Sequence, residues 1–212
     1  MISRWARRWC GSIFDSPLGL LIVAGITPLM LSIAGLAAMI LAGWACALNK
    51  MAVAGILIFI GGALDGLDGE LARIASLASE SGGFIDSVCD HLGDLAIYFG
   101  ICWRAEVIRD GTQVLLLLAA MFGSLFGSLL RARAGAFGID LKDVGLVTRF
   151  ERLLIVFVGV VVNILGPALW VLAVLTNVSA MQRLIHVLIP LYGKPIGVAP
   201  VKPDTSGELN KT

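Results

Sequence analysis

The sequence predicts an all-α integral membrane protein with six transmembrane helices and an N-terminal amphipathic surface helix. Two features of the composition indicate this fold class: 58% of the 212 residues are hydrophobic and 15% are charged. A soluble domain has about 45–50% apolar and about 25% charged residues. The mean hydropathy of +0.92 points the same way. In addition, the apolar residues gather in six runs, each near the ~20 residues that a spanning helix needs.

The first element is expected over residues 1–20. Arginines alternate there with large apolar side chains: Arg4, Trp5, Arg7, Arg8, Trp9, Ile13 and Phe14. This pattern is typical of a helix that lies on the membrane surface. No small-residue cleavage site follows a clean apolar core, so the segment does not read as a signal peptide.

A single membrane domain of six helices is expected over residues 21–192. The apolar runs predict spans at residues 27–47, 51–75, 82–104, 112–132, 149–166 and 168–190. Residues 193–212 hold Gly, Pro, Ser and Lys and predict a flexible tail.

The distribution of basic residues predicts the orientation in the membrane. Six spans place both termini on the same side. Of the 16 Lys and Arg residues, only Lys50, Arg104 and Arg109 fall in turns at the opposite end. Because basic residues are retained in the cytoplasm, both termini are expected to be cytoplasmic.

Five aspartates lie between residues 64 and 94, at the cytoplasmic ends of the second and third spans. Asp65 and Asp68 share one helix face, and so do Asp86 and Asp90. Neighbouring antiparallel helices can direct both pairs at one point, where the carboxylates would repel one another without a cation. Their oxygens suit Mg²⁺, Mn²⁺ or Ca²⁺. Helix capping or ion pairing is the simpler explanation, but Arg73 alone cannot neutralise four carboxylates.

Small residues and an arginine adjoin these acids. Gly69 follows Asp68, Ala72 lies one turn later, and Gly82 opens the third span. Small residues allow a helix or a ligand to approach the backbone closely. Arg73 is placed to hold a phosphate. A metal, a phosphate-binding arginine and a free carboxylate together are what phosphoryl transfer requires.

Eight of these residues keep a fixed spacing: Asp65-x2-Asp68-Gly69-x2-Ala72-Arg73-x8-Gly82-x3-Asp86-x3-Asp90. This pattern resembles the signature of the CDP-alcohol phosphotransferase (CDP-alcohol phosphatidyltransferase) family at every fixed position. The six-helix layout with an N-terminal surface helix is also similar to that family.

The resemblance implies a reaction and a set of site residues. An acceptor hydroxyl would attack the phosphorus of a CDP-linked alcohol, usually CDP-diacylglycerol, and CMP would leave. Two divalent cations, Mg²⁺ or Mn²⁺, would be held by four carboxylates: Asp65, Asp68, Asp86 and Asp90. Asp90 would also be the base for the acceptor hydroxyl. The residues expected to make room for the nucleotide or contact its phosphates are Gly69, Ala72, Arg73 and Gly82. Members of the family are typically homodimers.

A second, basic cluster bears on the acceptor: Arg131, Arg133, Lys142, Arg149 and Arg152. It is interpreted either as a positive-inside loop that binds anionic headgroups or as a pocket for a phosphorylated acceptor. The segments "SLLRARAG" and "TRFERLL" resemble the phosphatidylinositol-phosphate synthase branch of the family, which uses inositol phosphate. Arg183 also fits that branch, whereas His91 stands at a common arginine position. Glycerol 3-phosphate or another alcohol stays open as the acceptor.

Alternative functions also follow from the residues. A divalent-cation transporter would use intramembrane carboxylates too, but its site should lie near the midplane and be reachable from both faces. A membrane scaffold would leave the acidic set without a role. Asp94 could orient Arg73 or another basic group, or stay protonated. The net charge of +1 gives no basic field for nucleic acid.

Overall fold

The computed structural model describes residues 17–193 apart from residues 76, 78, 105, 106, 108, 142 and 143. All regular elements in this part of the chain are helices: α2 (Pro17–Val23), α3 (Pro28–Ala47), α4 (Met51–Ile74), α5 (Glu80–Trp103), α7 (Gly111–Ala136), α8 (Arg149–Val161) and α9 (Leu165–Gly193). The all-α class is therefore confirmed. Residues 1–16 of the predicted surface helix and residues 194–212 of the predicted tail lie outside the described residues, so both stay predictions.

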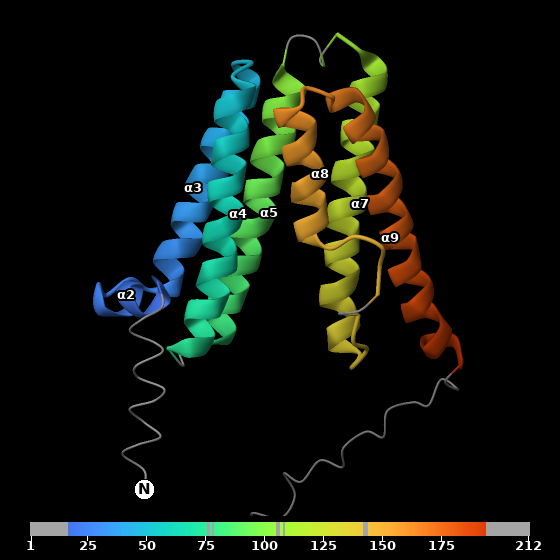
Figure 1. Cartoon of the computed structure of the whole chain (residues 1–212). Helices are drawn as coiled ribbons and strands as arrows, with labels where there is room; N and C mark the ends of the chain where they lie inside the picture. Colours follow the sequence, from blue (N-terminus) through green and yellow to red (C-terminus); the bar gives the residue numbers. More distant parts are fainter. Residues whose placement is uncertain are drawn as a thin grey trace, which may run out of the picture.

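The long helices form two groups of three that stand side by side (Figure 1). Helices α3, α4 and α5 make one group, and α7, α8 and α9 make the other. The groups meet where α4 packs on α8 and α5 packs on α7. The short helix α2 lies across the end of α3. Residues from both groups share the main core, among them Met39, Ile97, Leu117, Val160 and Leu169.

Close helix contacts inside each group depend on glycine. A Cβ built on Gly43 of α3 would lie 2.2 Å from the carbonyl oxygen of Ala96 on α5. A Cβ on Gly123 of α7 would lie 2.6 Å from Thr176 Oγ1 on α9. Small residues at such crossings let the backbones approach, which is how helices associate in the absence of a hydrophobic driving force.

Asparagine ends two of the helices. Asn49 follows α3 with φ 61°, and Asn163 follows α8 with φ 59°. At α8, the Asn163 N–H donates to the Val160 carbonyl and the Ile164 N–H to the Gly159 carbonyl. This is the Schellman arrangement, which satisfies the last helical carbonyls.

The predicted end of the fifth span was wrong. It was expected over residues 149–166, but α8 ends at Val161 and α9 already begins at Leu165. The apolar run continues through the turn, so hydropathy does not mark the boundary, whereas the left-handed Asn163 does. The other predicted spans agree with α3, α4, α5, α7 and α9 to within a few residues.

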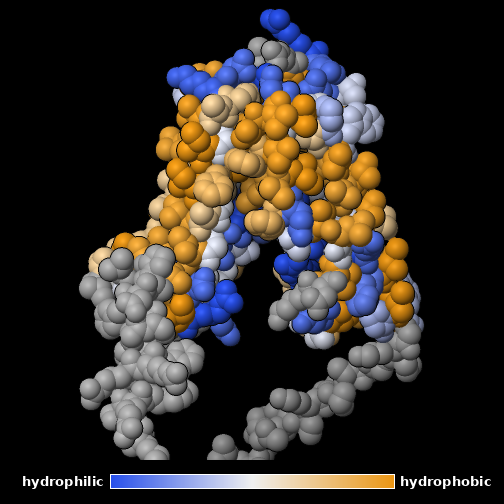
Figure 2. All heavy atoms as spheres, viewed as in Figure 1, coloured by the Kyte–Doolittle hydropathy of each residue, from blue (hydrophilic) through white to orange (hydrophobic). Residues whose placement is uncertain are grey.

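Among the described residues, four helices are long and apolar enough to cross a membrane: α3, α4, α7 and α9. The other two predicted spans do not meet both conditions. Helix α5 is long enough but carries Glu80 and three aspartates, and α8 has 13 residues, or about 20 Å. Apolar side chains cover the flanks of the molecule, and polar side chains gather at the ends and in a hollow between the two helix groups (Figure 2). The structure thus shows an integral membrane architecture with a polar cleft at one end.

Candidate active site

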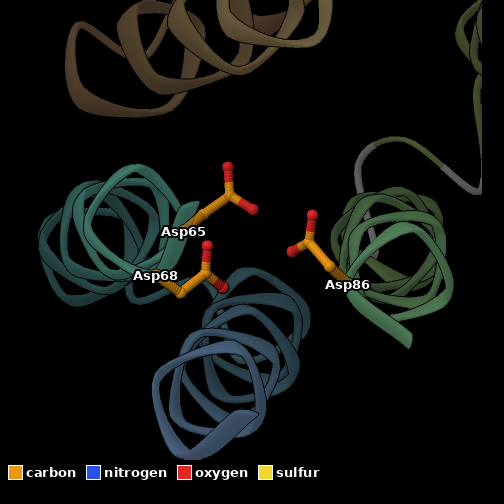
Figure 3. Close-up of side chains that lie close together, drawn as sticks. All are labelled: Asp65, Asp68 and Asp86. Atoms are coloured by element: carbon orange, nitrogen blue, oxygen red, sulfur yellow. The ribbon is translucent and has the colours of Figure 1, made fainter. Parts of the chain in front are cut away.

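Three aspartates converge at the cleft (Figure 3). Helix α4 supplies Asp65 and Asp68, and the neighbouring α5 supplies Asp86. Each offers one carboxylate oxygen, and these oxygens lie within 4.8 Å of one another. The three-residue spacing on α4 places both of its aspartates on the face toward α5, as the sequence predicts.

The cluster fits a hard divalent cation. Asp68 is 4% exposed, and Asp86 Oδ1 is buried with no hydrogen-bond partner among the residues that the structure describes. An unpartnered buried carboxylate oxygen is costly, and like charges this close repel strongly in a partly buried site. Oxygen ligands of this kind are the ones that Mg²⁺ and Mn²⁺ prefer.

Asp68 has a partner that the sequence reasoning missed. The hydroxyl of Ser32 on α3 donates a hydrogen bond of 2.5 Å to Asp68 Oδ2. This bond fixes one carboxylate oxygen of Asp68 beside the cluster. A serine inside an apolar span was the available signal, because such residues often bond to a neighbouring helix.

Asp90 lies one turn deeper on α5 and is joined to the cluster through Arg149 of α8. Arg149 Nη1 lies 2.8 Å from Asp90 Oδ1 and 2.6 Å from Asp65 Oδ2. The cation that reaches these acids therefore comes from the other helix group. Arg73, the arginine that sequence proximity suggested, donates through Nε to the Gly69 carbonyl of its own helix, at 3.0 Å.

The four residues expected at the nucleotide lie near the turn between α4 and α5. Gly69 and Arg73 are exposed on the last turns of α4, and a Cβ on Gly69 would lie 4.0 Å from Arg73 Nη2. Ala72 is half-buried on the same helix. Gly82 is exposed at the start of α5, where its N–H donates to the Ser79 side chain at 3.1 Å.

A polar cavity of about 300 Å³ opens beside Asp90. Four of the predicted acceptor residues line it, from three helices: Arg131, Arg149, Arg152 and Arg183. Its other lining residues include Asp94, His91 and Ser128. The fifth predicted residue, Arg133, is exposed and is not among those that line this cavity in the described part of the chain. Lys142 lies outside the described residues.

Two of these arginines are deeply buried and held in place. Arg152 is 7% exposed, and its Nη2 lies 3.2 Å from Asp94 Oδ2. Arg183 is 3% exposed, and its Nε donates to the Val144 carbonyl at 2.9 Å. Gly145, with φ +117°, brings this loop against the guanidinium, since a Cβ there would lie 3.0 Å from Arg183 Nε. The cavity is thus a pre-formed pocket of positive charge, suited to a phosphate.

An apolar groove of about 380 Å³ leads away from the same acids, between α4 and α8. Asp65 and Arg149 stand at its polar end, and Phe59, Phe150 and Phe157 line its apolar length. No local sequence pattern predicts this groove, because hydropathy marks Phe59 and Phe157 as apolar residues of two separate spans.

Comparisons with known proteins agree with this architecture. Residues 25–188 match the family described as CDP-alcohol phosphatidyltransferase. Archaetidylinositol phosphate synthase of Pyrococcus horikoshii is 36% identical over 159 residues, which cover 75% of this chain and 82% of that protein. Phosphatidylinositol phosphate synthase of Mycobacteroides abscessus is 33% identical over 173 residues, covering 77% and 78%.

Solved structures extend the likeness to the fold. The crystal structure of Mycobacterium tuberculosis phosphatidylinositol phosphate synthase with CDP-DAG bound matches with a TM-score of 0.77 at 28% identity, over 85% of this chain and 96% of that one. A structure of the same enzyme in complex with manganese and citrate matches with a TM-score of 0.75 at 27% identity, over 87% and 91%.

Proposed function

We propose that this chain, which belongs to the CDP-alcohol phosphatidyltransferase family, transfers a phosphatidyl group from CDP-diacylglycerol to the hydroxyl of inositol phosphate and releases CMP. One observation carries the proposal. The carboxylate cluster and the four-arginine cavity adjoin each other, because Arg149 of the cavity pairs both with Asp65 of the cluster and with Asp90. A site that must bring a metal-bound diphosphate and a phosphorylated alcohol together needs this adjacency.

The metal would be held by Asp65, Asp68 and Asp86, with Asp90 completing the set. Bound Mg²⁺ or Mn²⁺ supplies positive charge that neutralises the diphosphate and stabilises the departing CMP. Support comes from the three clustered oxygens and the unpartnered Asp86 Oδ1. It also comes from the related M. tuberculosis enzyme, whose structure was solved with manganese.

The donor would lie along the α4–α8 face. The phosphates would stand at the acids, with Arg73 reaching them from the end of α4 and Gly69, Ala72 and Gly82 leaving room for the nucleotide. An acyl chain would enter the apolar groove past Phe150 and Phe157. The groove offers an acyl chain the same apolar surroundings as the bilayer interior, which suits a lipid-linked donor better than a soluble CDP-alcohol.

The acceptor would bind in the polar cavity, with its phosphate on the arginines and its hydroxyl near Asp90. Asp90 would take the hydroxyl proton, and support comes from its position, because it lines both the polar cavity and the small pocket next to Asp65 and Asp86. An unphosphorylated alcohol such as inositol would offer no anion to Arg183, a buried guanidinium whose Nε donates to the Val144 carbonyl. Inositol phosphate is the favoured acceptor because the relatives are archaetidylinositol phosphate and phosphatidylinositol phosphate synthases. Glycerol 3-phosphate is the competing phosphorylated acceptor.

The deciding experiment measures CMP release by the purified protein with Mg²⁺ and CDP-diacylglycerol. The acceptor panel is inositol phosphate, glycerol 3-phosphate, inositol and serine, and an ether-linked CDP-lipid is run in parallel as donor. We expect release with inositol phosphate and no release after chelation by EDTA. Release with glycerol 3-phosphate alone would reassign the acceptor, and binding of Mn²⁺ without binding of any CDP-lipid would favour the transporter.

Membrane placement and assembly complete the proposal. We place both termini and the cleft on the cytoplasmic side, with α5 and α8 as the remaining spans of a six-helix domain. A fluorescent protein fused after Thr212 should then fluoresce in cells. Homodimer formation, which the family resemblance implies, is tested by the mass of the purified protein in detergent.

A further inference from the structure

Asp94 stands where the two helix groups meet at the inner end of the polar cavity. It is 7% exposed and lies one turn beyond Asp90 on α5. Each of its carboxylate oxygens faces a different arginine of α8. Oδ2 lies 3.2 Å from Arg152 Nη2, and Oδ1 lies 3.5 Å from Arg149 Nε. One carboxylate thereby spans both arginines across the seam between the groups.

The two arginines depend on Asp94 to different degrees. Arg149 also contacts Asp65 and Asp90, so its position has further support. Arg152 is buried, and its ion-pair partner among the described residues is Asp94. A buried guanidinium that loses its carboxylate keeps its desolvation cost. Its long side chain is then free to adopt other rotamers.

The surroundings restrict where Arg152 can turn. On the side away from the cavity, Asp94 and Arg152 are closed in by Ile97, Tyr98, Leu153 and Val156. Three of these residues are apolar, and Tyr98 is 3% exposed. Released from Asp94, the guanidinium would move toward the polar cavity, where it would meet Arg131 and Arg183. Repulsion between these cations would spread the phosphate-binding groups apart.

We propose that Asp94 is a positioning residue for the reaction: it holds Arg149 and Arg152 as a rigid pair directed at the phosphate of the acceptor. It acts through the arginines and touches neither the metal nor the transferred phosphorus. The assignment rests on the proposed function for the identity of the acceptor, but the chemistry that it requires is a phosphate group alone. Asp94 therefore governs acceptor affinity, while Asp65, Asp68 and Asp86 govern the donor.

The test compares Asp94→Asn and Asp94→Glu with the wild-type protein. The first removes the charge, and the second keeps the charge but displaces the guanidinium groups by one methylene. The matched control is Asp110→Asn, which changes a carboxylate at the opposite end of the molecule and keeps a good helix cap. Binding of CDP-diacylglycerol and Mn²⁺ verifies that each variant is folded.

The primary measurement is binding of inorganic phosphate to the CDP-lipid-loaded protein. Both Asp94 variants should bind phosphate roughly 10- to 100-fold more weakly, by analogy with the loss seen when the hydrogen-bond partners of metal-ligating side chains are removed. The KM for the acceptor should rise in parallel, with a much smaller change in kcat. Asp110→Asn should match the wild-type protein in phosphate binding and in the KM for the acceptor. Variants that bind phosphate as tightly as the wild type overturn the proposal.

Two further outcomes separate this inference from its alternatives. If the KM for inositol phosphate rises while phosphate binding is unchanged, Asp94 contacts the hydroxyls of the acceptor directly, and the positioning role is wrong. If no acceptor supports CMP release but phosphate binding still depends on Asp94, the proposed function fails and the positioning role stands. A wild-type protein that binds no phosphate would overturn both.

Discussion

Arg149 Nη1 on α8 lies 2.6 Å from Asp65 Oδ2 on α4, across the seam between the two helix groups. This ion pair places a guanidinium beside carboxylates that are also the candidate metal ligands. The positive charge and a divalent cation therefore compete for the same oxygens. The acids and the arginines form one charge network rather than two adjacent sites.

Replacing Arg149 by glutamine should strengthen metal binding and weaken turnover. Loss of the competing charge should lower the apparent Kd for Mn²⁺ roughly tenfold, or about 1.4 kcal/mol. The stabilisation by Mn²⁺, measured as a shift in Tm, should increase accordingly. Arg133→Gln is the control, because that arginine is exposed and does not line the cavity in the described part of the chain. A smaller metal-induced shift in Arg149→Gln would contradict this account.

Asp90→Asn should abolish most turnover and spare binding of the CDP-lipid. The amide cannot accept the proton of the acceptor hydroxyl, and general bases typically contribute about 10²- to 10⁴-fold to the rate. CMP release and equilibrium binding of CDP-diacylglycerol, measured on the same preparation, separate the two effects. Turnover near the wild-type level would remove Asp90 from the base role.

Ser32→Ala should destabilise the protein when no metal is bound. The change leaves Asp68 Oδ2, on a side chain that is 4% exposed, without its hydroxyl donor. An unsatisfied buried acceptor costs about 1–3 kcal/mol, and added Mn²⁺ should restore part of the lost stability. Thermal unfolding in detergent measures both effects. Ser81→Ala, on the exposed start of α5, is the control and should have little effect.

Gly43→Ala should push α3 and α5 apart at their crossing and destabilise the protein. The new methyl group would lie 2.2 Å from the Ala96 carbonyl oxygen and 3.3 Å from the Ile97 nitrogen, so the backbones must separate. Overpacking of this kind costs about 1–3 kcal/mol and sometimes more, and the acids of α5 would shift with their helix. Gly166→Ala, where nothing lies within 4 Å of the new Cβ, should leave Tm unchanged or slightly higher. Equal Tm values for the two variants would disprove the close crossing.

The stability that Asp110 contributes should depend on pH. This residue caps α7 at the end of the molecule away from the cleft. Hydrogen bonds from the Gln113 side chain and from the Gln113 and Thr112 N–H groups lower its pKa below the ordinary 3.8. Because the folded pKa is depressed, the cap stabilises α7 above pH 3.8, and that contribution is lost as the pH falls through the folded pKa. Asp110→Ala should therefore lower Tm at neutral pH, and the deficit should shrink in strong acid. A deficit that does not change with pH would exclude the charged cap.

Local patterns in the sequence account for much of the fold and for the acidic half of the site. The spacing of Asp65 and Asp68 fixes their common face on any helix, and the apolar runs fix where most helices lie. The end of α8 could not be predicted from hydropathy. The helix ends because Asn163 adopts a left-handed backbone conformation, and the apolar run continues past it. The pairing of Ser32 with Asp68 depends on how α3 packs against α4, which no local pattern encodes.

The sequence by itself determined the membrane character, the helical class and the set of acids that suits a metal and a phosphate. The tertiary structure alone decided which cation meets those acids. Arg73 is eight residues from Asp65 and bonds to its own helix, whereas Arg149 is far along the chain and bridges Asp65 and Asp90. The physical reason is that helix periodicity sets the direction of a side chain within one element. Which elements face each other depends on packing, and here α4 lies against α8 and places Arg149 and Arg152 over the acids of α4 and α5.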